Sequence, residues 1–145
     1  MKIGVLKEDK PNEKRVALTP STVSKIRKLG YDISIESNAG LLSNFFNNAY
    51  EEAGAGISSN EDIFKCDIIL KINKPSAEEI EQLSSNQSLI SFFSPATNSE
   101  ALQMCSKDNL NILSMDSVPR ISRAQKMDAL SSMANVAGSR AVIEA

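Results

Sequence analysis

Polar side chains that could recognise a small molecule are concentrated in residues 119–132. The segment begins with a proline, carries arginine, glutamine, aspartate and serine side chains, and enters an alanine-rich helix. Gln125, Asp128 and Ser132 fall at positions i, i+3 and i+7, and this spacing places them on one face of the predicted helix. Such groups form hydrogen bonds with amides, hydroxyls and ring substituents. The pattern therefore indicates a binding surface, and the alternative is a capped, solvated surface helix.

The same predicted helix has a second face that is apolar. Leu130, Met133 and Ala137 recur there at helical spacing, which is typical of a face that packs on a core. Gly138 follows Ala134 by four residues, and we expect these small side chains to permit the close packing of another helix.

The composition excludes several classes of function. The chain has 145 residues, which is enough for one domain with its own core. Its net charge is −2 and it contains no basic tract, so nucleic acid is not an expected partner. Because the chain contains no histidine, it cannot carry a Ser-His-Asp or Cys-His nucleophile or a histidine-bound metal, and no metal site is expected.

The apolar segments and the cysteines indicate where in the cell the protein is expected. No apolar run reaches about 18 residues, so we expect no direct insertion into a membrane. The chain passes at once into a strand-like segment, without the pattern of a signal peptide. Cys66 and Cys105 lack the spacing of metal ligands, and we expect both to be small core residues in a reduced, cytosolic compartment.

Strands and helices are expected to alternate along the chain. The clearest helix starts are Thr19 followed by Pro20, and a capping box formed by Ser76 and Glu79. Asn98 is expected to cap a later helix. Strands are predicted at residues 2–6, 32–36, 67–72, 88–93 and 110–113, and helices at residues 20–29, 47–53, 60–64, 77–83 and 99–105, with the polar helix after them.

This alternation predicts one α/β domain over residues 1–145. We expect three layers, with a doubly wound and mostly parallel sheet of the flavodoxin-like or Rossmann-like kind. Ligands bind at the carboxyl ends of the strands in such sheets. Four polar segments follow strands at that edge and together favour a site there, although each alone could be a solvated loop: residues 7–15, the lysines Lys71 and Lys74, residues 94–98, and residues 120–132.

The glycines do not form a dinucleotide fingerprint. Gly54 and Gly56 are followed by no third glycine, so no Gly-x-Gly-x-x-Gly loop opens a helix. We therefore do not expect this chain by itself to hold the pyrophosphate of a dinucleotide. Because the sequence stops inside a predicted helix, we expect a downstream nucleotide-binding Rossmann domain that this chain lacks.

Five motifs reveal a family resemblance. They read KIGV at residues 2–5, EKRVALTP at 13–20, ESNAG at 36–40, ILKINKP at 69–75, and MDSVPRISRAQ at 115–125 followed by DALSS at 128–132. The whole chain resembles the N-terminal domain shared by alanine dehydrogenase and the alpha subunit of proton-translocating nicotinamide nucleotide transhydrogenase. The last motif is highly specific and points to the transhydrogenase branch.

The resemblance implies roles for the residues of that last motif, which would surround the nicotinamide of NAD(H). Arg120 would hold the carboxamide and would be oriented by Asp128. Gln125 would reach the nicotinamide ribose and face NADP(H) on a partner domain. Ser131 and Ser132 would complete the cofactor pocket. Arg120, Gln125 and Asp128 are thus the predicted catalytic residues.

The resemblance also implies an activity and partners. The chain would be the N-terminal part of the NAD(H)-binding component of NAD(P) transhydrogenase, which transfers hydride between NAD(H) and NADP(H) and couples the transfer to proton translocation. NAD(H) would be bound mainly by the missing downstream domain, so the chain alone would be inactive. We expect a homodimer that lies on the cytoplasmic or matrix side of the inner membrane, held there by an NADP(H)-binding domain and a membrane domain.

Two other functions remain open at this point. The first is an amino-acid oxidoreductase domain like alanine dehydrogenase, in which a histidine after the fourth strand acts as acid and base; this chain has Ser94 there. The resemblance puts Arg15 and Lys71 where that branch binds its substrate, and we expect both to be structural here. The second is a non-catalytic α/β module that binds a small molecule or a subunit.

Overall fold

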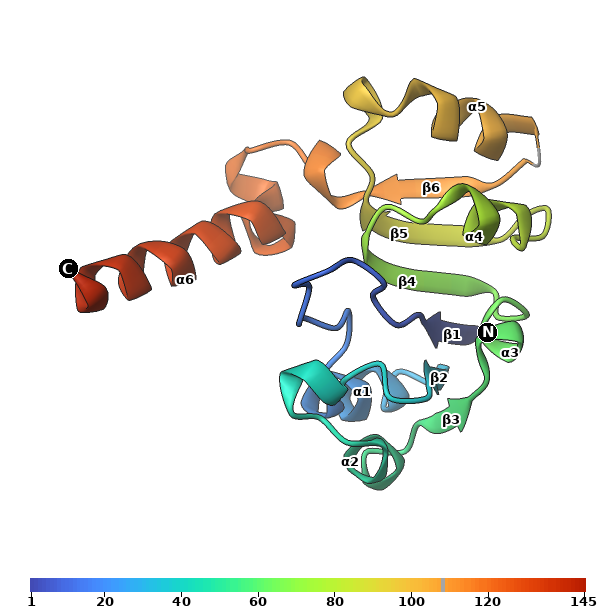
Figure 1. Cartoon of the computed structure of the whole chain (residues 1–145), viewed down its shortest axis with the longest axis horizontal. Helices are drawn as coiled ribbons and strands as arrows, with labels where there is room; N and C mark the ends of the chain where they lie inside the picture. Colours follow the sequence, from blue (N-terminus) through green and yellow to red (C-terminus); the bar gives the residue numbers. More distant parts are fainter. Residues whose placement is uncertain (108) are drawn as a thin grey trace.

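A parallel sheet of six strands forms the centre of the protein. The computed structural model describes residues 1–107 and 109–145. Neighbouring strands pair in the order β3-β2-β1-β4-β5-β6, and every pairing is parallel (Figure 1). The strands are β1 (Lys2–Val5), β2 (Asp32–Glu36), β3 (Gly56–Ser58), β4 (Ile68–Asn73), β5 (Ser88–Phe92) and β6 (Asn111–Ser114). The predicted doubly wound α/β fold is confirmed, and the strand order reverses between β1 and β4.

Helices connect the strands. The α-helices are α1 (Pro20–Arg27), α2 (Asn47–Glu52), α3 (Asn60–Ile63), α4 (Ala77–Glu81), α5 (Ser99–Lys107) and α6 (Ala129–Glu144), and the 3-10 helices are η1 (Leu41–Ser43), η2 (Pro95–Thr97), η3 (Met115–Ser117) and η4 (Ser122–Met127). Two predicted start signals are confirmed. The Thr19 side chain accepts a hydrogen bond from the Thr22 N–H before α1. Ser76 and Glu79 form the complete capping box of α4.

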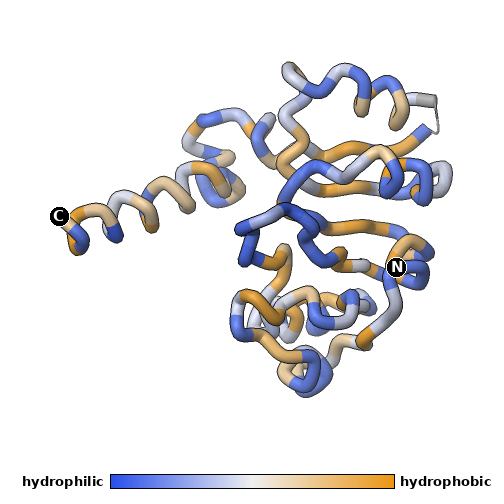
Figure 2. The backbone as a smooth tube through the Cα atoms, in the orientation of Figure 1, coloured by the Kyte–Doolittle hydropathy of each residue, from blue (hydrophilic) through white to orange (hydrophobic). Residues whose placement is uncertain are grey.

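Helices cover both faces of the sheet and enclose two apolar cores. Figure 2 colours much of the central strands as hydrophobic. The core under α1 and α2 consists of Ile3, Val5, Leu18, Val23, Ile33, Ile35, Ala39, Tyr50 and Ala55. The core under α3, α4 and α5 consists of Leu6, Ile63, Phe64, Cys66, Ile69, Ile80, Leu83, Leu89, Phe93 and Cys105. The prediction that both cysteines are core residues is therefore confirmed.

Strand β3 was not predicted from the sequence. It has three residues and one apolar side chain, Ile57, which gives no alternation to detect. Its parallel register with β2, in which Ile35 faces Ile57, makes it a strand. Tertiary pairing thus formed a strand where the local pattern carried no signal.

Helix α6 projects away from the sheet (Figure 1). Leu130 and Met133 are half-buried, but every residue from 134 to 145 is exposed. The predicted apolar face is therefore covered only over the first turns of α6, and Ala137 lies outside it. Among the described residues, nothing lies within 4 Å of a Cβ built on Gly138, so no helix of the described part packs there and the expected close packing stays a prediction. No helix of the described part combines the length and apolar character needed to cross a bilayer.

Candidate functional site

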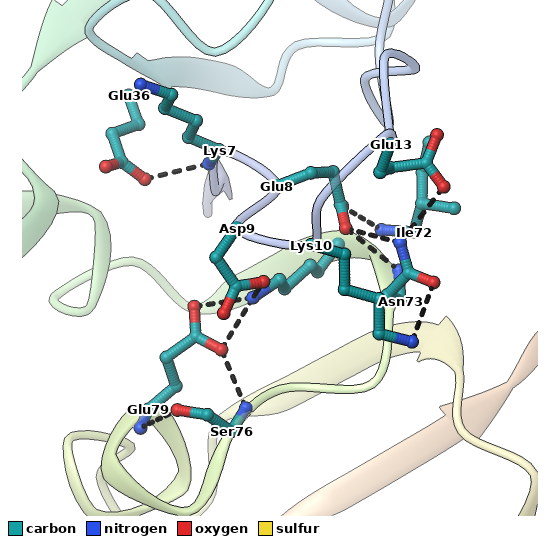
Figure 3. A network of polar contacts seen from close by, with 11 residues as sticks. Lys7, Glu8, Asp9, Lys10, Glu13, Glu36, Ile72, Asn73, Ser76 and Glu79 are labelled. Atoms are coloured by element: carbon teal, nitrogen blue, oxygen red, sulfur yellow. Dashed lines mark hydrogen bonds and ion pairs between the residues drawn. The ribbon is translucent and has the colours of Figure 1, made fainter.

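Residues 7–15 are fastened to the carboxyl end of β4 by a buried carboxylate (Figure 3). Glu8 is only 7% exposed. It accepts hydrogen bonds from the backbone N–H of Ile72 at 2.6 Å, from the N–H of Asn73 at 3.2 Å and from Asn73 Nδ2 at 2.8 Å. Lys10 Nζ donates to Asn73 Oδ1 at 3.1 Å. These bonds fix the path of the loop, so it is not a freely solvated segment.

Glu13 and Arg15 form a bidentate ion pair at the end of the same loop. Arg15 donates from Nε to Glu13 Oε1 at 2.9 Å and from Nη2 to Oε2 at 2.7 Å. Asn73 Nδ2 adds a bond to Glu13 Oε2 at 3.1 Å. Hydrogen bonds from Arg15 lower the pKa of Glu13 to about 2, against the opposing effect of its burial. Both partners are therefore charged at neutral pH.

Lys71 points into the protein. Its side chain is fully buried, and its ammonium lies 2.6 and 2.7 Å from the two oxygens of Glu79 and 3.1 Å from Asp9 Oδ1. Burial alone would lower the pKa of Lys71, but the hydrogen bonds and charges of Glu79 and Asp9 raise it. Both carboxylates belong to the protein itself, which supports the expectation that Lys71 is structural.

Four of the predicted site residues lie around one cavity between η4 and the start of α6. We call it the Arg120 cavity. Its volume is about 290 Å³. It is lined by Arg120, Ile121, Ser122, Gln125, Asp128 and Ser131. Arg120 and Gln125 are exposed, whereas Asp128 is buried. The cavity presents a guanidinium, an amide, a carboxylate and hydroxyls, which together can bind a planar polar group.

Asp128 is the N-cap of α6 and is engaged by Ser131. The Ser131 N–H donates to Asp128 Oδ1 at 3.0 Å, and Ser131 Oγ donates to Oδ2 at 2.6 Å. These hydrogen bonds, with a smaller contribution from the charge of Arg120, lower the pKa of Asp128. Among the described residues, no hydrogen bond or ion pair joins Arg120 to Asp128. The charge of Arg120 nevertheless acts on Asp128, and the implied orientation of Arg120 by Asp128 stays a prediction.

The prediction of one continuous polar helix face was wrong. Gln125 lies in the 3-10 helix η4, and α6 begins only after Asp128, whose ψ of 86° breaks the helical path. The side chain of Asp128 competes for the first free N–H groups of the helix, which is why it ends the segment rather than continuing it. Ser132 lies apart from the Arg120 cavity: it lines an adjoining, more apolar cavity of about 760 Å³, and its hydroxyl donates to the Asp128 carbonyl.

The four polar segments do not converge on one cavity. Lys74 and Asn98 bond to each other and line a separate cavity of about 420 Å³ between α4 and α5. The Asn98 carbonyl accepts from the Leu102 N–H, as an N-cap carbonyl does. Its side-chain oxygen accepts from Lys74 Nζ and its amide nitrogen donates to the Phe93 and Ser94 carbonyls, so among the described contacts Asn98 caps α5 through its carbonyl and not through its side chain.

Ser94, which the family resemblance places opposite the histidine of the alanine dehydrogenase branch, has a left-handed backbone with φ of 50°. It forms hydrogen bonds with Asp116. Burial alone would raise the pKa of Asp116, but hydrogen bonds from Ser114 and Ser94 lower it. Ser94 thus serves a local hydrogen-bond network at the end of β5.

Sequence reasoning missed one contact that links the first loop to α6. Arg15 Nη1 contacts Met133 Sδ, and both residues line a further cavity of about 290 Å³ together with Ala129 and Phe92. The two residues are 118 positions apart. The nearest available signal was the placement of Met133 on the apolar face of the helix, which did not identify its partner.

Comparisons with known proteins identify relatives of this chain. The model of the family described as "Alanine dehydrogenase/PNT, N-terminal domain" matches residues 4–137. The sequence is 50% identical over 145 residues to NAD(P) transhydrogenase subunit alpha of Haemophilus influenzae, covering all of this chain and 28% of that protein.

Two solved structures are also similar. The crystal structure of transhydrogenase from Sinorhizobium meliloti matches with a TM-score of 0.95 and 41% identity, covering all of this chain and 44% of that one. A structure of L-alanine dehydrogenase matches with a TM-score of 0.79 and 29% identity over 81% of this chain and 33% of that one. The chain thus spans less than half the length of each of these three relatives.

Proposed function

This chain belongs to the family of alanine dehydrogenase/PNT N-terminal domains, and on that premise we propose that it serves in hydride transfer between NAD(H) and NADP(H). In this proposal it is the N-terminal domain of the NAD(H)-binding component of a NAD(P) transhydrogenase, and the transfer is coupled to proton translocation. The 50% identity to a transhydrogenase alpha subunit supports this branch over the alanine dehydrogenase branch.

One structural observation carries the proposal: Arg120, Gln125, Asp128 and Ser131 line a single cavity. Its volume of about 290 Å³ and its polar lining fit a nicotinamide group, but not a whole dinucleotide. The sequence contains no glycine-rich phosphate loop to hold the rest. We therefore assign the Arg120 cavity to the nicotinamide end of NAD(H), and the adenosine and pyrophosphate to a downstream domain.

The nicotinamide ring, when bound, supplies or accepts the hydride. Arg120 would bind the carboxamide through its guanidinium donors, which suit planar acceptors. Gln125 would donate to and accept from the adjacent ribose and would face NADP(H) on the partner domain. Asp128 and Ser131 keep the wall of the cavity in place, because Ser131 holds both oxygens of the Asp128 carboxylate.

Direct hydride transfer between two rings requires alignment and the exclusion of water, and it moves no proton. The absence of histidine from the sequence is therefore compatible with the proposed reaction. In contrast, an amino-acid dehydrogenase needs an acid and base. Ser94 cannot supply one at neutral pH, and Arg15 is bonded to Glu13 through Nε and Nη2.

We also propose partners for this domain, because its relatives extend well beyond it. They are an NADP(H)-binding domain, a membrane domain and a second copy in a homodimer. The domain would lie on the cytoplasmic or matrix side of the inner membrane and reach it only through these partners.

The test uses the full-length protein together with its NADP(H)-binding partner. Single-turnover transfer from NADH to an oxidised NADP analogue should be observed, and alanine with NAD should give no turnover. Alanine-dependent reduction of NAD without transfer between the nucleotides would overturn the proposal.

A further inference from the structure

We propose that Arg15 is a positioning residue that holds the first turns of α6, and with them the Arg120 cavity, against the carboxyl edge of the sheet. Its kinetic consequence rests on the proposed function, whereas its structural consequence does not.

The anchored end is Glu13, whose side chain is 11% exposed. Glu13 accepts from the Arg15 N–H at 3.0 Å, in addition to the two guanidinium bonds, and from Asn73 at the end of β4. A bidentate arginine–carboxylate pair fixes the plane of the guanidinium as well as its position. The orientation of Arg15 is therefore set by the sheet through Asn73 and Glu13.

The free end of the guanidinium reaches α6. With Nε and Nη2 occupied by Glu13, Nη1 contacts the thioether of Met133. Sulfur is a weak acceptor, so most of the effect comes from packing of the guanidinium and its stem against Met133. No residue of α6 is fully buried, and beyond Met133 every described residue of the helix is exposed. The contact with Arg15 is thus one of few that tie this helix to the domain.

The geometry links that contact to the Arg120 cavity. Met133 lies two residues beyond Ser131 and five beyond Asp128, the N-cap of the same helix. Because a helical turn is rigid compared with the connecting loop, displacing Met133 also displaces Ser131 and the carboxylate that it holds. This assignment gives Arg15 a structural role, with Nε and Nη2 bonded to Glu13 and Nη1 packed against Met133.

The structural test measures amide hydrogen exchange over residues 128–133 in the full-length protein. In Arg15→Ala, exchange at Ser131 and Ser132 should accelerate severalfold, because their amides bond to Asp128 at the loosened helix start. Arg15→Lys should have a similar effect, since lysine lacks the fork. Arg27→Ala, which removes an exposed arginine paired with Asp32, is the matched control and should leave this segment unchanged.

A double-mutant cycle tests whether Arg15 acts through Met133. The effects of Arg15→Ala and Met133→Ala should be clearly less than additive if the two residues act through their contact. If either Ala variant fails to fold, Arg15→Lys and Met133→Val, which shortens the side chain that contacts Arg15, supply the same comparison. Unchanged exchange at residues 128–133 in both Arg15 variants, or strictly additive effects, would overturn the proposal.

The kinetic test separates this inference from the proposed function. Hydride transfer in Arg15→Ala should fall about tenfold or more, whereas KM for NADH should change little, because misplaced rings slow the reaction more than they weaken binding. A merely destabilised protein would instead lose active molecules without changing the rate per folded molecule. If the wild-type protein shows no hydride transfer but exchange still accelerates in Arg15→Ala, the proposed function fails and the positioning role stands.

Discussion

Ser131 holds both oxygens of the Asp128 carboxylate, one through its backbone N–H at 3.0 Å and the other through its hydroxyl at 2.6 Å. Asp128 is therefore at once the N-cap of α6 and part of the wall of the Arg120 cavity. A capping interaction that merely begins a helix in most proteins here also shapes the candidate ligand site.

This relationship predicts a change in the titration of Asp128. Ser131→Ala removes the hydroxyl bond, so the pKa of Asp128 should rise from its lowered value toward the ordinary value of 3.8. Carbon-detected NMR of the carboxyl group across an acid titration measures it. Ser132→Ala is the matched control, because the Ser132 hydroxyl bonds to the Asp128 carbonyl and not to its carboxylate. A larger shift in Ser132→Ala than in Ser131→Ala would contradict the assignment.

The proposed roles of Arg120 and Gln125 predict losses of rate in the full-length protein. Gln125→Asn keeps the amide but shortens its reach by one methylene, and such misplacement can cost up to about 100-fold in hydride transfer. Arg120→Ala should be at least as damaging, because it removes the forked donor. NADH affinity should fall less than the rate if the adenosine half is bound elsewhere. Single-turnover transfer measures the effect, with circular dichroism as the control for folding. Wild-type rates in both variants would mean that the segment is only a solvated surface.

The buried ion pair of Lys71 predicts a large effect on stability. Lys71→Met should destabilise the protein by about 3 kcal/mol, because it leaves Glu79 and Asp9 without their shared cation. Lys71→Met combined with Glu79→Leu should recover part of this loss. Urea unfolding measures both, and Lys65→Met, which removes an exposed ion pair with Asp62, serves as the control with little effect. A loss in Lys71→Met no larger than in Lys65→Met would argue against a buried pair.

The lowered pKa of Glu13 predicts a pH dependence of stability. Because its folded pKa of about 2 lies below the ordinary value of 4.5, Glu13 stabilises the fold fully above pH 4.5, and this contribution is lost as the pH falls toward 2. The difference in unfolding free energy between the wild type and Glu13→Gln should therefore shrink as the pH is lowered from about 5 to about 3. Urea unfolding at several pH values tests this, and a difference that grows on acidification would reverse the assigned sign.

Because residue 94 is a serine, we predict that the protein has no amino-acid dehydrogenase activity. The full-length protein should not oxidise alanine with NAD, because Ser94 supplies no acid or base. Ser94→His should not create the activity, since Arg15 remains bound to Glu13 and the backbone at this position is left-handed. An NADH absorbance assay decides it, and robust turnover by the wild type would support the alanine dehydrogenase branch.

Much of the fold could be predicted from local signals, and most of the misses arose where distant residues decide the structure. The capping box of Ser76 and Glu79 and the proline after Thr19 act within one turn, so they can be read directly. Strand β3 forms only by pairing with β2. The contact of Arg15 with Met133 joins residues with no shared local pattern.

The candidate site was also predicted only in part. The residue types of the Arg120 cavity were predicted, but their helical spacing suggested a single face that the structure does not have. Spacing assumes that an α-helix runs through every position, whereas Asp128 caps α6 and leaves Gln125 in a 3-10 helix. A residue with strong capping preference in the middle of a periodic pattern is thus a reason to divide the pattern in two.

The projecting helix α6 is long, and it is held to the domain only near its N-terminal end. Its 16 residues give it a length of about 24 Å at about 1.5 Å per residue. A rotation of about 10° at its N-terminal end would sweep the far end through about 4 Å at that length. The few contacts near Asp128 and Met133 therefore set the direction of the whole helix, because a small rotation there would displace its far end by several ångströms.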